Sequence, residues 1–145
     1  MKKAIESKKS EVTSDVVSRA ENKLAGASQA FSFDFRDKTV LDIGSSTGGF
    51  TEYALRHGAK RVFAVEKGTN QMKAPLRFDP RITLLEKTDI FFVDFAKFGP
   101  IDVVLADVSF VSLKKVLAHV KLQPEVRSAD FLMMLKPQFE AKPLQ

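Results

Sequence analysis

The chain has 145 residues, 44% of them hydrophobic, which is enough for one domain with its own core. No run is apolar enough to span a bilayer and the first residues lack the apolar stretch of a signal peptide, so we expect a cytoplasmic protein. The absence of cysteine excludes disulfides and thiolate metal sites, and we predict no metal. The net charge of +5 permits a nucleic-acid partner without requiring one.

The first 14 residues are charged and polar, and they predict a flexible arm or the remnant of a linker. A helix is expected from Ser14 or Asp15 to about Phe31, because either residue can cap its first turn. Lys23 lies in the middle of this helix, where the simplest interpretation is a solvated lysine.

Residues 39–43 predict a strand that breaks into a glycine-rich loop and then a helix over about residues 49–57, which ends at Gly58. Strand, loop and helix in this order form the ligand pocket of open α/β sheets. The loop is neither a dinucleotide fingerprint, because its glycine spacing differs, nor a P-loop, because Phe50 stands where lysine is needed.

Asp42, at the end of this strand, narrows the choice of ligand. Its carboxylate would repel a pyrophosphate but suits a cation such as S-adenosylmethionine, which carries an ammonium and a sulfonium. A tight turn that binds nothing is the alternative. The residues predicted to bind S-adenosylmethionine here are Asp42, Gly44, Ser45, Ser46, Thr47, Gly48, Gly49 and Phe50.

Further strands are predicted at residues 61–65, 82–85, 101–106 and 130–135. Between them we expect a short helical turn within 70–76, a helical or irregular piece over 91–98 and a helix over about 113–122. Apolar strands that alternate with helices predict an α/β fold with a mostly parallel sheet.

Charged residues stand at the carboxyl ends of all five predicted strands: Asp42, Glu66, Asp89, Asp107 and Lys136. Because these ends share one edge of a parallel sheet, the five residues predict a single site. An acid at the position of Glu66 accepts hydrogen bonds from ribose hydroxyls in βαβ sites, and Asp89 would lie near a base or ribose. Each residue could instead be an ordinary charge at a strand end.

Four segments carry a resemblance to a known family: Ser-Arg-Ala-Glu-Asn-Lys-Leu at 18–24, the glycine loop at 41–51, Ala-Asp-Val-Ser-Phe at 106–110 and Leu-Lys-Pro-Gln-Phe-Glu at 135–140. In this order they resemble the haemolysin A (TlyA) proteins, among the FtsJ-like ribose 2′-O-methyltransferases. The resemblance covers about residues 16–140. It implies a doubly wound Rossmann-like fold, S-adenosylmethionine as cofactor and ribosomal RNA or a ribosomal subunit as partner.

The resemblance also implies a Lys-Asp-Lys-Glu catalytic tetrad, in which Lys23, Asp107 and Lys136 take the first three places. Lys136 would accept the proton of the ribose hydroxyl, Lys23 would help to lower the pKa of Lys136, and Asp107 would orient it. The glutamate belongs to a later strand and is not Glu140. We therefore expect residues 15–145 to be a truncated methyltransferase domain that lacks its C-terminal strands, without a recognisable S4-type domain before it.

Two other functions stay open, and one structural consequence follows. The chain could be a cofactor- or RNA-binding fragment without turnover, or a membrane-active haemolysin, for which the sequence offers no spanning segment. Because the fourth residue of the tetrad is absent with its strand, we expect little methyl transfer by the chain as it stands. The fifth strand would have an unpaired outer edge, so dimerisation or aggregation along residues 130–136, or a tail that folds back over the edge, is expected.

Overall fold

The structure is a computed structural model that describes residues 33–108 and 110–134. The predicted arm, the predicted helix with Lys23, and the chain from Leu135 onward with Lys136 lie outside the described residues. The described α-helices and strands are β1 Thr39–Ile43, α3 Gly49–Arg56, β2 Arg61–Val65, β3 Ile82–Leu85, β4 Val103–Asp107, α4 Phe110–Lys121 and β5 Asp130–Met134. Four 3₁₀ turns connect them: η1 Leu76–Phe78, η2 Ile90–Phe92, η3 Phe95–Lys97 and η4 Pro124–Val126.

The five strands form one parallel sheet in the order β3-β2-β1-β4-β5. Leu41 at the centre of β1 pairs with Phe63 of β2 on one side and Val104 of β4 on the other. From β1 the chain therefore continues to β2 and β3 on one side, and it later returns to form β4 and β5 on the other side of β1. This reversal of strand order creates a ligand crevice at the carboxyl ends of β1 and β4. The predicted doubly wound α/β fold is confirmed.

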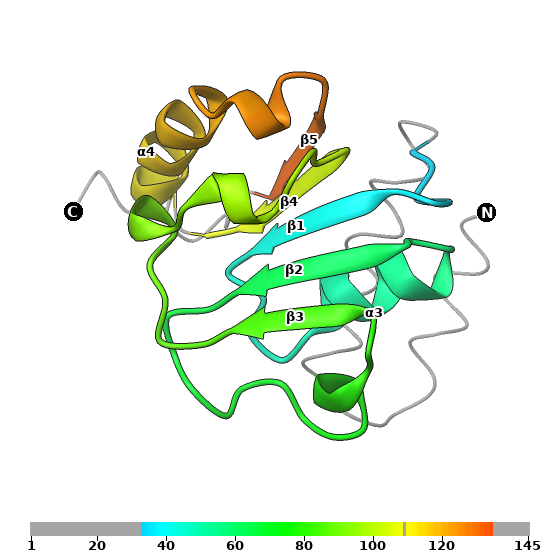
Figure 1. Ribbon diagram of the computed structural model, residues 1–145. Coiled ribbons are helices and arrows are strands. Elements are labelled where there is room, and N and C mark those ends of the chain that lie inside the picture. Colours follow the sequence, from blue (N-terminus) through cyan, green and yellow to red (C-terminus); the bar gives the residue numbers. More distant parts are fainter. Residues whose placement is uncertain (1–32, 109, 135–145) are drawn as a thin grey trace.

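Alternate residues of each strand face opposite sides of the sheet, and both sides are buried. Val40 of β1 packs with the α3 side chains, whereas Leu41 and Ile43 pack with those of α4. The two helices thus cover opposite faces (Figure 1). This double coverage explains why the strands read as nearly continuous apolar runs.

The predicted bounds of the first three strands are confirmed, and those of β4 are shifted. β4 begins at Val103 and not at Ile101, because the N–H of Ile101 donates to the carbonyl of Glu125 in η4 rather than to β1. β4 also extends to Asp107, one residue further than predicted, where Asp107 pairs with Met134 of β5.

The helices and turns differ from the prediction by a few residues. α3 ends at Arg56, and Gly58 takes the left-handed conformation that a helix C-terminus favours, with φ of +93°. α4 begins at Phe110, three residues early. The turn predicted within 70–76 is instead η1, and residues 91–98 contain parts of two 3₁₀ turns, η2 and η3.

Strand β5 pairs only with β4 among the described residues, so its outer edge stays a predicted site of association. We expect light scattering to show a mass that grows with protein concentration. Met133→Lys should reduce this growth by placing a charge at the edge, although Met133 is half-buried against the α4 face. A mass that does not change with concentration would contradict an open edge.

Candidate functional site

A cavity of about 360 Å³ lies at the carboxyl ends of β1, β2 and β4, where the fold predicts a ligand. Its volume is within the range of small-molecule sites. Five of the predicted site residues line it: Gly44, Ser46, Glu66, Asp89 and Asp107. The other lining residues are Ile43, Val65, Lys67, Thr88, Ile90, Phe91, Val108, Ser112 and Val116. The structure thus brings together predicted residues as far apart in the sequence as Gly44 and Asp107, which are separated by 63 positions.

Carboxylates dominate the charge of this cavity. Glu66, Asp89 and Asp107 line it, and Lys67 is the one basic residue among the lining residues that the structure describes. The carboxylate of Asp42 lies close enough to Asp107 and Glu66 for their charges to act on it. Such a cavity repels phosphate groups and favours a ligand that carries positive charge.

The loop after β1 depends on two glycines. Gly44 has φ of +77°, and a Cβ there would lie 3.2 Å from the carbonyl oxygen of Asp107. Gly48 has φ of +100°, and a Cβ there would lie only 2.5 Å from Cδ2 of Leu76. Both positions combine a left-handed backbone with a close neighbour, so glycine is required. Gly44 brings the β1 loop against the end of β4, which closes one side of the cavity.

Glu66 holds two loops of the cavity together. Its Oε1 accepts a hydrogen bond from the N–H of Ser46 at 2.7 Å, and its Oε2 accepts one from the N–H of Gly68 at 2.9 Å. The loops after β1 and β2 are therefore joined through one carboxylate. Because each carboxylate oxygen accepts more than one hydrogen bond, Glu66 keeps capacity for ligand hydroxyls.

Asp42 does not line the cavity but lies beneath the loop. It is fully buried, and the hydroxyl of Thr51 in α3 donates to its Oδ2 at 2.6 Å. Its Oδ1 has no hydrogen-bond partner among the described residues. The pKa of Asp42 is raised to about 7, chiefly by burial; hydrogen bonds from Thr51 oppose the rise, and the charges of Asp107 and Glu66 add to it. Asp42 therefore links β1 to α3 and titrates near neutrality.

Asp107 and Asp89 differ in the hydrogen bonds that their carboxylates already make within the protein. Oδ1 of Asp107 is buried and has no partner among the described residues, so a ligand donor could satisfy it. Oδ1 of Asp89 accepts a hydrogen bond from the N–H of Phe91 at 3.0 Å and so caps η2. This cap fixes the position of Phe91, which also lines the cavity.

Several predicted residues do not line the cavity: Asp42, Ser45, Thr47, Gly48, Gly49 and Phe50. Gly49 and Phe50 are buried in the first turn of α3, and the Ser45 hydroxyl is buried without a partner among the described residues. The predicted catalytic residues Lys23 and Lys136 lie outside the described residues. The structure therefore places only Asp107 of the three catalytic candidates.

Some lining residues are not among those predicted from the sequence, although three of them have a local signal. Thr88 and Phe91 flank the predicted Asp89, and Lys67 directly follows Glu66. Ser112 and Val116 are four residues apart and so share one face of α4. The sequence predicts a helix after β4, but its pattern does not show that this face turns toward the ligand edge of the sheet.

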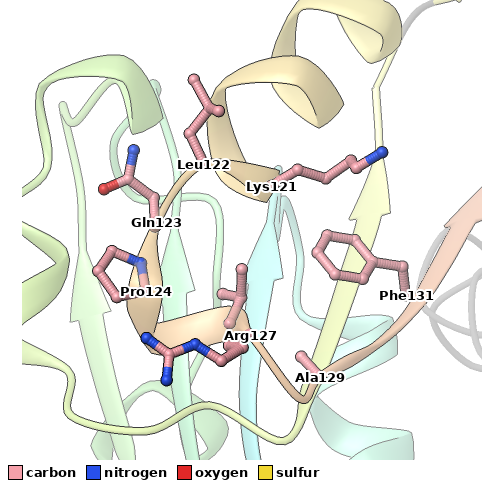
Figure 2. Close-up of a pocket in the computed structure, with 8 residues that line it drawn as sticks. Lys121, Leu122, Gln123, Pro124, Arg127, Ala129 and Phe131 are labelled. Atoms are coloured by element: carbon pink, nitrogen blue, oxygen red, sulfur yellow. The ribbon is translucent and has the colours of Figure 1, made fainter.

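A second cavity, of about 450 Å³, lies between the end of α4, η4 and the start of β5 (Figure 2). Lys121, Arg127 and Phe131 are among its lining residues, which include no carboxylate and none of the predicted site residues. It lies at the amino ends of the strands, whereas ligands of open α/β sheets bind at the carboxyl ends. The first cavity is therefore the candidate site.

Neither a metal site nor a membrane-spanning helix is found among the described residues. No group of three or more His, Cys, Asp or Glu side chains among them could hold a metal ion. No helix in the described part of the chain is long and apolar enough to cross a membrane.

Comparison with known proteins decides the family. The model of the FtsJ-like methyltransferases matches residues 16–145. The chain belongs to this family. The resemblance seen in the sequence is thereby confirmed, and solved structures with the same α/β sheet support the fold, among them a hemolysin-named protein of Lactococcus lactis.

This Lactococcus structure is 38% identical in sequence, with a TM-score of 0.76 over 89% of this chain and 62% of that one. Among curated relatives, the 16S/23S rRNA (cytidine-2′-O)-methyltransferase TlyA of Mycobacterium tuberculosis is 43% identical over 125 residues, which are 86% of this chain and 46% of that protein. Hemolysin A of Brachyspira hyodysenteriae is 39% identical over 129 residues, covering 87% and 53%. The chain thus spans about half the length of the curated relatives it matches.

Proposed function

We propose that this FtsJ-like chain binds S-adenosylmethionine and forms the methyl-transferring part of a ribosomal RNA ribose 2′-O-methyltransferase that works in the cytoplasm. The observation that carries the proposal is the acidic cavity at the switch point of the sheet, formed by Glu66, Asp89 and Asp107. Relatives named as rRNA (cytidine-2′-O)-methyltransferases support RNA as the substrate.

The residues of the cavity fit the cofactor. Glu66 has acceptor capacity for ribose hydroxyls, and Phe91 offers an apolar surface beside Asp89 for the adenine. The unpartnered Oδ1 of Asp107 can accept a hydrogen bond from the ammonium group. When bound, S-adenosylmethionine supplies a methyl group on a sulfonium centre.

The protein must then align a ribose hydroxyl with this methyl group and help the hydroxyl to lose its proton. Alignment alone contributes about 7–11 kcal/mol in favourable cases. In this proposal Lys136 takes the hydroxyl proton, and its pKa is lowered by the neighbouring positive charge of Lys23. Asp107 orients Lys136 from the end of β4.

The alternative is a fragment that binds cofactor or RNA without turnover. The enzyme and a cofactor-binding fragment both bind S-adenosylmethionine, so binding alone does not separate these two functions. Incubation with ribosomal subunits and S-adenosylmethionine labelled in its methyl group does separate them, because only the enzyme transfers label to RNA. Label that is absent while the cofactor binds would favour the binding function for this chain.

Asp107→Asn tests the cavity directly. We expect this variant to bind S-adenosylmethionine at least tenfold more weakly, because a charge-assisted hydrogen bond contributes about 1.5–3 kcal/mol. Asp130→Asn makes the same chemical change at an exposed residue at the other end of the sheet and should bind like the wild type. Isothermal titration calorimetry measures both affinities. Equal affinities of the two variants would contradict the role of Asp107.

A further inference from the structure

The positive charge of the described chain is concentrated in one segment. Residues 60–87 carry seven Lys or Arg and three Asp or Glu, whereas the other described residues carry eight and ten. The segment contains β2 and β3, and the connection between them passes along the outer side of β3, at the bottom of Figure 1. One edge of the sheet is therefore basic, while the rest of the described chain is slightly acidic.

The three acidic side chains of this segment are already engaged. Glu66 accepts from two backbone amides. Asp79 accepts from the guanidinium of Arg81 at 3.0 and 2.8 Å. Glu86 accepts from Nη2 of Arg77 at 3.2 Å. Asp79 and Glu86 thus compensate Arg81 and Arg77, so the excess charge of the segment comes from its lysines and Arg61.

Three exposed lysines lie on this segment, and two of them, Lys67 and Lys87, lie at the mouth of the cavity. Lys67 lines the cavity itself. The backbone N–H of Lys87 donates to the carbonyl of Gly68 at 3.0 Å, so the loops that carry Lys67 and Lys87 are in contact. The carbonyl of Lys73 accepts from the backbone N–H of Arg77 at 3.1 Å, and the side chain of this arginine binds the residue before Lys87. None of the three lysines has a carboxylate partner in the part of the chain that the structure describes.

The cavity is thus acidic and its rim is basic. This arrangement suits the binding of an RNA strand. A ribose hydroxyl that reaches the cofactor brings its flanking phosphates to the mouth of the cavity, where the acidic interior would repel them. Cations at the rim compensate this repulsion, and lysine contacts to phosphates supply affinity that does not depend on sequence. We propose that Lys67, Lys73 and Lys87 form the phosphate-binding surface for the RNA substrate, an inference that rests on the proposed function.

The double variant Lys73→Gln/Lys87→Gln tests this surface. Its affinity for a labelled single-stranded RNA oligonucleotide should fall several-fold, and the slope of log K against log salt should shrink by about 1.4, since each phosphate contact contributes about 0.7. The control Lys97→Gln/Lys121→Gln removes the same charge from exposed lysines of η3 and α4 and should keep the wild-type slope. Neither residue of the test variant lines the cavity, so its affinity for S-adenosylmethionine should not change.

Equal losses in the test and control variants would overturn the proposal, because they would show that only net charge matters. Unchanged RNA binding together with a lost affinity for anionic phospholipid vesicles would also overturn it and would identify a membrane-binding surface. Failure of the proposed function is distinguishable. The RNA-binding surface would be supported and the cofactor site contradicted if RNA binding depends on Lys73 and Lys87 but the wild-type chain gives no heat with S-adenosylmethionine.

Discussion

Between pH 5 and pH 8, the free energy of unfolding of the wild type should fall by about 2–3 kcal/mol more than that of the Asp42→Asn variant. The pKa of Asp42 rises from 3.8 to about 7 in the folded chain, chiefly through burial. Between these two values the folded state binds more protons than the unfolded state, so stability decreases as pH rises. The Asp42 contribution is fully present below about pH 4 and is lost as pH passes through 7. The amide of asparagine does not titrate and can still accept a hydrogen bond from Thr51.

Urea unfolding at several pH values measures this difference. Asp130→Asn is the matched control, because it changes an exposed carboxyl group at the start of β5 and should keep the wild-type pH dependence. If Asp42→Asn and the wild type show parallel curves over this pH range, Asp42 does not have the raised pKa that its burial predicts.

Glu66→Ala should lower cofactor affinity by more than tenfold and the free energy of unfolding by about 2 kcal/mol. The substitution leaves the N–H groups of Ser46 and Gly68 without their acceptors, and a hydrogen bond to a charged group contributes about 1.5–3 kcal/mol. The loops after β1 and β2 would then no longer be held together across the cavity. Calorimetric titration and urea unfolding measure the two effects.

Two further variants separate the role of Glu66 from a general loss of charge. Glu66→Gln keeps one carbonyl oxygen but turns an NH₂ group toward the other amide, so it should give an intermediate loss in both measurements. Glu52→Ala removes a glutamate whose surface ion pair with Arg56 in α3 contributes about 0.3–0.5 kcal/mol, and it should bind the cofactor normally. A Glu52 variant as weak as the Glu66 variant would contradict the loop-joining role.

The sequence predicted the strands that surround the site because buried parallel strands have a strong pattern. The observed bounds of β1, β2 and β3 agree with the predicted ones. The start of β4 was predicted two residues too early, because Ile101 is as apolar as the strand that follows. The N–H of Ile101 donates to the carbonyl of Glu125 in η4 and so does not join the hydrogen bonds of the sheet. Such a long-range backbone contact leaves no signal in the local sequence.

The sequence predicts which edge of the sheet carries the candidate site, but not the direction in which each side chain points. The carboxyl ends of the strands place Glu66, Asp89 and Asp107 together as expected. Asp42 was expected in the same cavity but faces Thr51 of α3. Strand alternation contained this information, because Asp42 shares a face with Val40, which packs on the α3 side. Val116 of α4 could not be predicted, because the orientation of a helix over the sheet depends on the whole fold.

The measurement that most directly tests the site is an NMR titration of the ¹⁵N-labelled chain with S-adenosylmethionine. We expect saturable shifts of the backbone amides around the cavity, at Gly44, Ser46, Gly68 and Asp107. The amides of the second cavity, over residues 121–131, should not change. Shifts confined to residues 121–131, or none at saturating ligand, would contradict binding of the cofactor at the carboxyl ends of β1, β2 and β4.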